Sequence, residues 1–372
     1  MLRALLLVSL IFAAPVAAQT TANNPELAAI AESLRDSADA PGAAVMVMDG
    51  GEVRIGVAGV RALGQTPQIT PDDLWHIGSD TKAMTATLVA RLVEQGVVSW
   101  DDTIGERLGG VIEDIDPAYA GLSFRHLLSH RAGIAANVGR FDMVRFVMEG
   151  ADGRPMPQQR IDYAGKVLGQ PPAATPETEF LYSNAGYVVA GAMLDQATGE
   201  SWETLLTREV FEPLGMASAG FGAPGSASVI DQPRGHRSGM FGGFNAIAPG
   251  PGADNPPVMG PAGTVHISLT DLARYMAAHM AGERGEETAF LSNESWHTLH
   301  TPPFGGNYAL GWGLDDGVLA HAGSNTMWLV QIVMDPSRDL GVVIAFNDGR
   351  TDRLMPLARA EIAELMDSEA AD

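Results

Sequence analysis

The stretch GSDTKAMTATLVARLVEQG, residues 78–96, organises this chain. Its apolar residues recur at helical spacing over 81–94, and Gly96 follows as a residue that commonly ends a helix. Because the helix begins just after Ser79, the side chains of Ser79 and Lys82 lie on one face, about one turn apart. The sequence therefore places a serine and a lysine together at a helix start.

A serine hydroxyl is a weak nucleophile and needs a base beside it. A lysine provides that base only when burial or nearby cations lower its pKa towards neutrality. The helix start adds free N–H groups that favour a developing oxyanion. Such a pair can also occur on a solvated helix face, where it does no chemistry.

The use of basic residues sharpens this choice. The chain has 21 arginines but only two lysines, Lys82 and Lys166. Arginine cannot give up a proton near neutral pH, so it could not replace a basic lysine. Lys166 has Tyr163 three residues before it, which leaves Ser79 and Lys82 as the only Ser-x-x-Lys pair in the sequence. This favours a functional role for the pair.

Further from this helix, β-rich runs stand at both ends of the chain and helical patterns lie between them. We predict strands at 43–48, 53–57, 308–314, 328–334 and 342–346. The main helices are predicted from Pro25 and over 81–94, 187–197, 202–210, 268–280 and 352–366. His321 is expected to lie where the chain enters the strand near Trp328.

These patterns predict an α+β fold. One antiparallel sheet pairs the terminal strands, is flanked by the N- and C-terminal helices, and carries an inserted, mostly helical domain. The predicted boundaries are 19–80 and 262–372 for the discontinuous sheet domain and 81–261 for the helical domain. Residues 220–263, rich in glycine and proline, are expected to form a long surface excursion.

The first residues have the pattern of a secretory signal peptide. Arg3 precedes an apolar run over 4–14 that is too short to span a bilayer, and small residues precede Gln19. Cleavage after Ala18 would remove 1–18 and leave a mature chain without a membrane span. We expect an exported protein, periplasmic in a bacterium with two membranes.

Composition excludes several functions. With 46% apolar residues the chain can bury a sizeable core, and its net charge of −22 opposes nucleic-acid binding. It has no cysteine, which rules out thiol nucleophiles, disulfides and thiolate metal sites. The oligomeric state is not fixed by these features.

Two further short motifs carry groups that suit acyl transfer. Tyr182-Ser183-Asn184 offers a phenol for proton transfer and an amide that can hold a lysine or a substrate. His321-Ala322-Gly323-Ser324 offers a donor or positive charge at His321 and, at Gly323, room for a substrate backbone. Each motif taken alone is more simply explained as structural.

Taken in order, Ser-x-x-Lys, Tyr-x-Asn and His-x-Gly resemble the penicillin-recognising serine hydrolases. The resemblance covers about 25–365 and is closest to the branch that holds class C β-lactamases, D-alanyl-D-alanine carboxypeptidases, D-aminopeptidases and carboxylesterases. Supporting stretches are Trp75-His76-Ile77-Gly78, His126-Leu127-Leu128-Ser129-His130-Arg131-Ala132-Gly133, Gly260-Pro261-Ala262-Gly263 and Leu310-Gly311-Trp312-Gly313.

The resemblance implies a β-lactamase/transpeptidase-like fold and a role for each matched residue. Ser79 would attack a carbonyl and form an acyl-enzyme, with Lys82 or a Tyr182 held by Lys82 as the base. Tyr182 would relay the proton to the leaving group, and Asn184 would orient Lys82 and the substrate. The N–H groups of Ser79 and Ser324 would form the oxyanion hole. No metal or organic cofactor is implied.

One departure bears on the substrate. Class C β-lactamases usually carry Lys-Thr-Gly where this chain has His321-Ala322-Gly323, and alanine cannot donate the hydrogen bond of the threonine. We therefore expect an esterase or a peptidase acting on D-amino-acid amides. A true β-lactamase and a non-catalytic protein that binds peptidoglycan or peptides remain the alternatives.

Other motifs in the sequence are weaker evidence of function. Gly220-Phe221-Gly222-Ala223-Pro224-Gly225 matches a dinucleotide-binding pattern, but it contains proline and lacks a strand–turn–helix context. No G-x-S-x-G elbow is present. The pairs His126/His130 and His297/His300 lack the glutamate of H-E-x-x-H, so packing or capping is the simpler interpretation. No role is assigned to His76 or His266.

Overall fold

The computed structural model describes residues 21–149, 153–239, 243–286 and 288–369. The predicted signal peptide, 1–18, lies outside these residues. The main sheet has six antiparallel strands in the order β2-β1-β11-β10-β9-β8. Their bounds are Gly42–Asp49 (β1), Glu52–Gly59 (β2), Gly313–Asp315 (β8), Val318–Ser324 (β9), Leu329–Asp335 (β10) and Leu340–Phe346 (β11).

The two ends of the chain meet at the centre of this sheet. β1 pairs with β11, so that Val45 lies opposite Ile344, almost 300 residues later. Alternate residues of β1 enter two separate cores, with Val45 in one and Met46 in the other. The predicted α+β class with paired terminal strands is confirmed.

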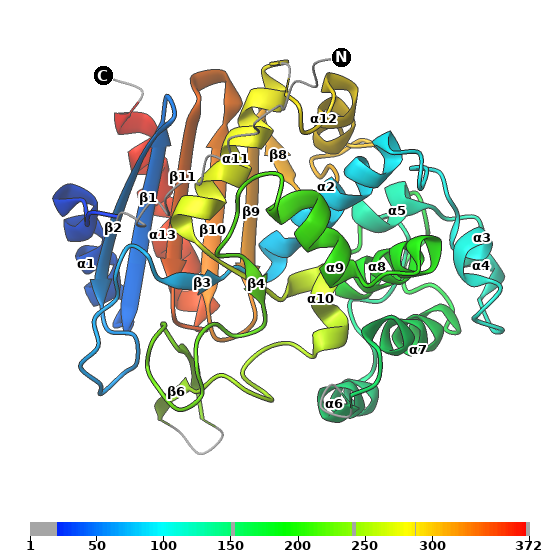
Figure 1. Cartoon of the computed structure of the whole chain (residues 1–372), viewed down its shortest axis with the longest axis horizontal. Helices are drawn as coiled ribbons and strands as arrows, with labels where there is room; N and C mark the ends of the chain where they lie inside the picture. Colours follow the sequence, from blue (N-terminus) through cyan, green and yellow to red (C-terminus); the bar gives the residue numbers. More distant parts are fainter. Residues whose placement is uncertain (1–20, 150–152, 240–242, 287, 370–372) are drawn as a thin grey trace, which may run out of the picture.

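Helices cover both faces of the sheet (Figure 1). α1 (Pro25–Ala38) and α13 (Thr351–Ser368) pack on one face. Asn24 caps α1 by accepting a hydrogen bond from the Leu27 N–H (3.0 Å), as the Asn-Pro pair predicts. α11 (Leu269–Glu283) crosses the opposite face, where Met276 packs against β11 at Gly341.

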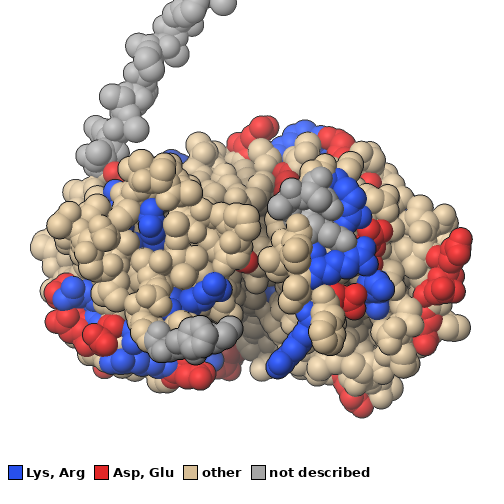
Figure 2. Space-filling model, turned by 90° about the horizontal axis from the view of Figure 1, so that it is seen from below, with Lys and Arg blue, Asp and Glu red and all other residues tan. Residues whose placement is uncertain are grey.

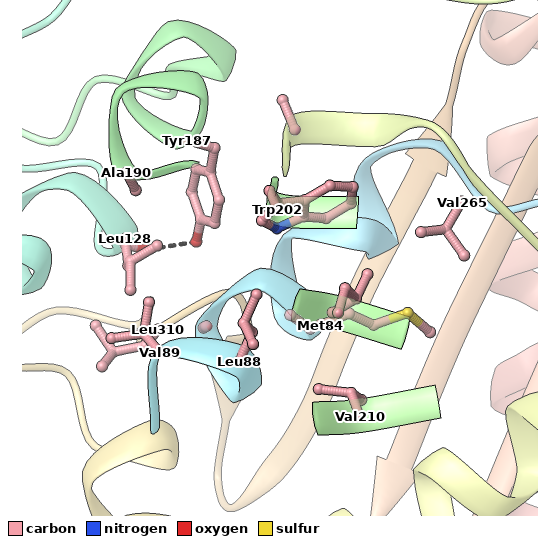
Figure 3. Packing of buried hydrophobic residues seen from close by; sticks show 14 of the residues in the cluster. Met84, Leu88, Val89, Leu128, Tyr187, Ala190, Trp202, Val210, Val265 and Leu310 are labelled. Carbon is pink, nitrogen blue, oxygen red and sulfur yellow. Dashed lines mark hydrogen bonds between the residues drawn. The ribbon is translucent and has the colours of Figure 1, made fainter. Parts of the chain in front are cut away.

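A helical region lies beside the sheet, with α2 (Thr81–Glu94) between the two (Figure 1). α2 is buried on nearly every side, and Figure 3 shows its residues Met84, Leu88 and Val89 among side chains of the surrounding helices. The other helices are α3 (Ile104–Leu108), α4 (Pro117–Ala120), α5 (Phe124–Leu128), α6 (Arg140–Glu149), α7 (Met156–Leu168), α8 (Asn184–Thr198), α9 (Trp202–Leu206), α10 (Gly260–Gly263) and α12 (Asn293–His300).

The prediction of a strand over 308–314 is wrong. Only Gly313–Asp315 forms a strand, β8, and the chain before it doubles back so that Ala309 N–H donates to Trp312 O (2.8 Å). The run is apolar because Leu310 and Trp312 are fully buried in the core. Gly311 (φ +85°) lies so close to α2 that a Cβ there would be 2.6 Å from Ala83 Cα.

Two further expectations need correction. His321–Ser324 does not lead into the strand near Trp328 but ends a separate strand, β9, which pairs with β10. The excursion over 220–263 also contains regular structure. β4 (Gly220–Phe221) joins β3 (Leu74–His76) and β7 (Val265–Ser268) in a small sheet, and β5 (Gly235–Ser238) pairs with β6 (Phe244–Ile247).

Within the described residues, no helix combines the length and apolar character needed to cross a lipid bilayer.

Candidate active site

Ser79 and Lys82 meet where a short 3-10 turn, Gly78–Asp80, runs into α2. Gly78 takes φ +51°, which suits a glycine, and brings the turn against β9. The Lys82 side chain is completely buried. Its Nζ lies 3.1 Å from Ser79 Oγ, so the pair predicted from the sequence is in direct contact.

Three oxygens surround the Lys82 amine. Besides Ser79 Oγ, Nζ donates to Asn184 Oδ1 (2.7 Å) and to the main-chain oxygen of Ala262 (2.6 Å). Burial lowers the pKa of Lys82 to about 7, and the nearby Asp80 carboxylate opposes that shift. At neutral pH a large fraction of the amine is unprotonated. In that form it can accept a hydrogen bond from the Ser79 hydroxyl.

Tyr182 completes a cluster around the serine. Lys82 Nζ lies 4.9 Å from the centre of the Tyr182 ring, and the Ser79 side chain is close enough to the phenol to lower its pKa. Burial raises the pKa of Tyr182 to about 12, so the phenol keeps its proton at neutral pH. The cluster thus pairs an amine that titrates near neutrality with a hydroxyl that stays protonated.

Asn184 is the first residue of α8, and its side chain bridges two regions. Its Oδ1 accepts from Lys82, while its Nδ2 donates to Asn137 Oδ1 (3.2 Å). Ser183 caps α8 by accepting from Gly186 N–H (2.9 Å). The helix cap therefore fixes the amide that holds the lysine.

His130, for which the sequence suggested only packing or capping, holds the segment that carries Tyr182. Its main-chain oxygen accepts from Leu181 N–H (2.9 Å) and its Nδ1 accepts from Ser183 N–H (3.1 Å). The ring lies 4.3 Å from the Tyr182 ring, and the residue takes an unusual φ of +60°. Burial holds the pKa of His130 well below its usual range, so the ring is neutral and can accept at Nδ1.

The sequence suggested that His321 would contact a substrate, but its side chain is enclosed by the protein. Its side chain is only 6% exposed, and its Nδ1 lies 2.9 Å from Asp80 Oδ1. Its Nε2 lies 3.3 Å from the Tyr308 hydroxyl. Both ring nitrogens are thus engaged by the protein, because β9 directs the side chain towards the buried aspartate that follows Ser79.

Position 323 must be a glycine, because main-chain atoms of the protein leave no room for a side chain there. A Cβ there would overlap the main-chain oxygen of Ile77 and lie 2.8 Å from Ser79 N. The expected close approach at this glycine is therefore made by the turn that carries the serine. Ser324 lies next to it, and both Ser79 and Ser324 line one cleft.

The cleft has a volume of about 650 Å³. Ser79, Asn184 and Ser324 line it together with Arg140 of α6 and Arg237 of β5. Figure 2 looks onto the face where α6 and the β5–β6 hairpin lie and shows it hollowed between two halves of the molecule. A second, more apolar cavity of about 480 Å³ adjoins the cleft, and both are lined by 254–256.

Sequence reasoning missed Asp254, which stands between these cavities. Its Oδ1 accepts from Asn325 Nδ2 (2.8 Å) and lies 2.8 Å from Nε2 of the fully buried His76. This ties the 250–257 segment to the strand before Ser79. His266 is held separately, with Nδ1 2.8 Å from Gly222 O. The described residues contain no group of three side chains suited to a metal ion.

Residues 27–367 match the Beta-lactamase family. The chain belongs to this family of serine hydrolases. Penicillin-binding protein 4 of Amycolatopsis lactamdurans is 30% identical over 257 residues, which cover 67% of this chain and 62% of that protein. The unguisins hydrolase ungD of Aspergillus violaceofuscus is 29% identical over 48% of this chain. The chain spans less than two thirds of the length of these relatives, 62% and 31% respectively.

Solved structures share the fold of this Beta-lactamase family member. A class C beta lactamase from Rhodobacter sphaeroides has a TM-score of 0.70 at 20% identity, covering 92% of this chain and 99% of the other. A D-stereospecific amidohydrolase from Streptomyces sp. has a TM-score of 0.67 at 21% identity, covering 90% and 98%. The resemblance inferred from the three motifs is confirmed at the level of family and fold.

Proposed function

We propose that this protein is an exported serine hydrolase that works through an acyl-enzyme on esters or on D-amino-acid amides and peptides. The observation that carries the proposal is the buried Lys82 amine, with its pKa near 7, placed 3.1 Å from Ser79 Oγ. A buried amine that titrates near neutrality can act as a general base at physiological pH. A protein that only bound peptides would not need it.

In this proposal the unprotonated Lys82 takes the proton of Ser79 as Oγ attacks the carbonyl carbon. Tyr182 remains a phenol at this pH, because burial raises its pKa to about 12. Lys82 is therefore the better base of the two. The N–H groups of Ser79 and Ser324 stabilise the negative oxygen of the tetrahedral intermediate.

The intermediate collapses when the bond to the leaving group breaks, and the proton held by Lys82 passes through Tyr182 to that group. Water then attacks the acyl-enzyme and gives up a proton along the same route to Lys82. When the ester bond to Ser79 breaks, this proton passes from Lys82 to Oγ, which releases the acid and free Ser79. Asn184 keeps Lys82 in place through its 2.7 Å hydrogen bond.

Esters and D-amino-acid amides are favoured over β-lactams because of the third motif. His321 is bonded to Asp80 and Ala322 has no hydroxyl, so neither side chain supplies the donor that Lys-Thr-Gly would offer. The D-stereospecific amidohydrolase that shares the fold is consistent with amide substrates. Because a class C beta lactamase also shares the fold, a β-lactam is included among the substrates to be tested.

Covalent labelling tests the proposal. A fluorophosphonate probe should label the wild type and an exposed-serine control, Ser337→Ala, but not Ser79→Ala. The panel should contain p-nitrophenyl esters, D-alanine amides, D-Ala-D-Ala peptides and nitrocefin. Turnover of nitrocefin comparable to that of the esters would favour a β-lactamase. No labelling and no turnover would favour the binding protein.

Export has its own test. We propose that 1–18 direct secretion and are removed after Ala18, leaving a periplasmic protein in a bacterium with two membranes. Fractionation followed by N-terminal sequencing should find a chain that begins at Gln19 outside the inner membrane. An uncleaved chain retained in the cytoplasm would contradict this part of the proposal.

A further inference from the structure

His321 and Asp80 form a buried pair between two elements of the site. His321 lies on β9, three residues before Ser324, and Asp80 directly follows Ser79. Their side chains are 6% and 1% exposed, and Nδ1 of the histidine lies 2.9 Å from Oδ1 of the aspartate. The other aspartate oxygen has no hydrogen-bond partner among the described residues. The Asp80 side chain is therefore committed to this one contact.

The same two elements also touch through their backbones. A Cβ on Gly78 would overlap the N of Ser324, and a Cβ on Gly323 would lie 2.8 Å from the N of Ser79. The two glycines allow this approach but do not fix the relative position of the segments. A directional hydrogen bond between a buried imidazole and a buried carboxylate does so.

The histidine is itself held from its far side. The Asp80 carboxylate can only accept, so Nδ1 of the neutral imidazole carries the proton, and Nε2 can accept from the Tyr308 hydroxyl 3.3 Å away. Tyr308 packs on the His130 ring, with ring centres 4.9 Å apart. The pair thus connects the serine turn to the residues around Tyr182.

We propose that His321 and Asp80 are a positioning pair that sets the spacing between the N–H groups of Ser79 and Ser324. Neither side chain would touch the substrate. The assignment rests on the proposed function, since it is this function that gives the two N–H groups their role as oxyanion donors.

The proposal predicts an effect on the chemical step alone. Oxyanion donors act where negative charge develops in the transition state, so a shift between them lowers kcat without weakening ground-state binding. A displacement of about 1 Å can cost about 100-fold in rate. We expect kcat to fall and KM to stay unchanged when the pair is broken.

The experiment compares His321→Leu, Asp80→Leu and His321→Asn with the wild type on a p-nitrophenyl ester. His321→Leu should lose about 100-fold in kcat at unchanged KM. A trifluoromethyl ketone, whose adduct carries the tetrahedral oxygen, should lose affinity in parallel. His321→Asn keeps an N–H donor near the position of Nδ1 and should recover most of the rate.

The matched control is a second histidine–carboxylate pair, in which the histidine is buried and the carboxylate is exposed. His300 Nδ1 lies 2.6 Å from Glu283 Oε2, between α12 and α11. His300→Leu should lower the thermal midpoint and leave kcat and ketone affinity unchanged. If His321→Leu does not fold, Asp80→Leu carries the test, because leucine has nearly the shape of the aspartate side chain but offers no acceptor to His321 Nδ1.

The outcomes separate the two proposals. A fall in kcat in His321→Leu, together with a nearly normal kcat in His321→Asn, supports the positioning pair. An active wild type whose kcat and ketone affinity survive both His321→Leu and Asp80→Leu overturns the pair alone. A rise in KM at constant kcat also overturns it, because His321 would then contact substrate. A wild type with neither labelling nor turnover overturns the proposed function and this assignment with it.

Discussion

The two lysines of this protein occupy opposite environments although their sequence settings are alike. Each lies on a helix with a hydroxyl-bearing residue three positions earlier, Ser79 before Lys82 and Tyr163 before Lys166. Lys82 is completely buried with Nζ among three oxygens. Lys166 has a half-exposed side chain whose Nζ lies 4.0 Å from Asp142 Oδ1.

The difference shows that spacing alone does not make a base. α2 is enclosed by the sheet and the helical region, so the Lys82 ammonium loses its hydration and its pKa falls to about 7. On α7 the charged amine keeps its contact with water. Burial of the helix therefore separates a reactive lysine from a surface cation.

The largest expected effect comes from removing each lysine in turn. Lys82→Met should lower kcat/KM by about 10²–10⁴-fold, because it removes the proposed general base. Lys166→Met should leave the rate unchanged within about 2-fold, since its ion pair is exposed. Ester hydrolysis measured on both variants checks this. Equal losses of rate in Lys82→Met and Lys166→Met would contradict the distinction between a buried base and a surface cation.

The second largest effect is expected in the pH dependence of kcat/KM, which should follow the titration of the buried Lys82. Because the active form of Lys82 is the unprotonated amine, kcat/KM should rise with pH and level off above about 7, the pKa of the amine. Below that pH the rate should fall about 10-fold per unit. Lys166→Met should show the same profile. A wild-type rate independent of pH between 5 and 8 would argue against Lys82 as the base.

A smaller effect is expected at His130, which holds the Tyr182 segment. His130→Leu should lower kcat about 10-fold, because a bulky residue disfavours φ +60° and offers no acceptor to Ser183 N–H. His130→Asn should retain much of the rate, since asparagine tolerates that φ and carries an acceptor.

His126→Leu is the control for this change, because His126 caps α5 through Ser123. Its rate should match that of the wild type while its thermal midpoint falls. An equal loss of kcat in the His126 and His130 variants would show that the effect is general destabilisation.

Stability gives the finest distinction between the lysines. The pKa of Lys82 lies near 7 in the folded protein, against an ordinary value of 10.5 for lysine, so the unfolded chain binds more protons between these pH values. Unfolding free energy should therefore rise with pH across that window. Lys82→Met should lose this rise and be more stable than the wild type below pH 7, by about 1–4 kcal/mol.

Urea denaturation at pH 6 and pH 9 measures this difference. Lys166→Met should follow the pH dependence of the wild type, because its side chain remains in contact with water. A destabilised Lys82→Met at pH 6 would mean that the hydrogen bonds of the ammonium outweigh the cost of its burial.

Much of the fold was readable from the sequence because its signals are local. The helix that begins at Pro25, the strands at 43–48 and 53–57 and the helix over 81–94 all form close to their predicted bounds. The apolar run at 308–314 was misread because buried turns and strands share the same composition. Burial of Leu310 and Trp312 against α2 could not be inferred from that run alone.

Of the site, the sequence by itself indicated which residues we propose to carry the chemistry, because a nucleophile, a base and a phenol each require a particular side chain. Only the tertiary structure decided what surrounds them. It turned His321 away from the cleft onto Asp80, placed His130 beneath Tyr182 and brought Asp254 beside His76. These contacts join residues from 52 to 241 positions apart in the chain, and no local pattern encodes which buried groups will meet.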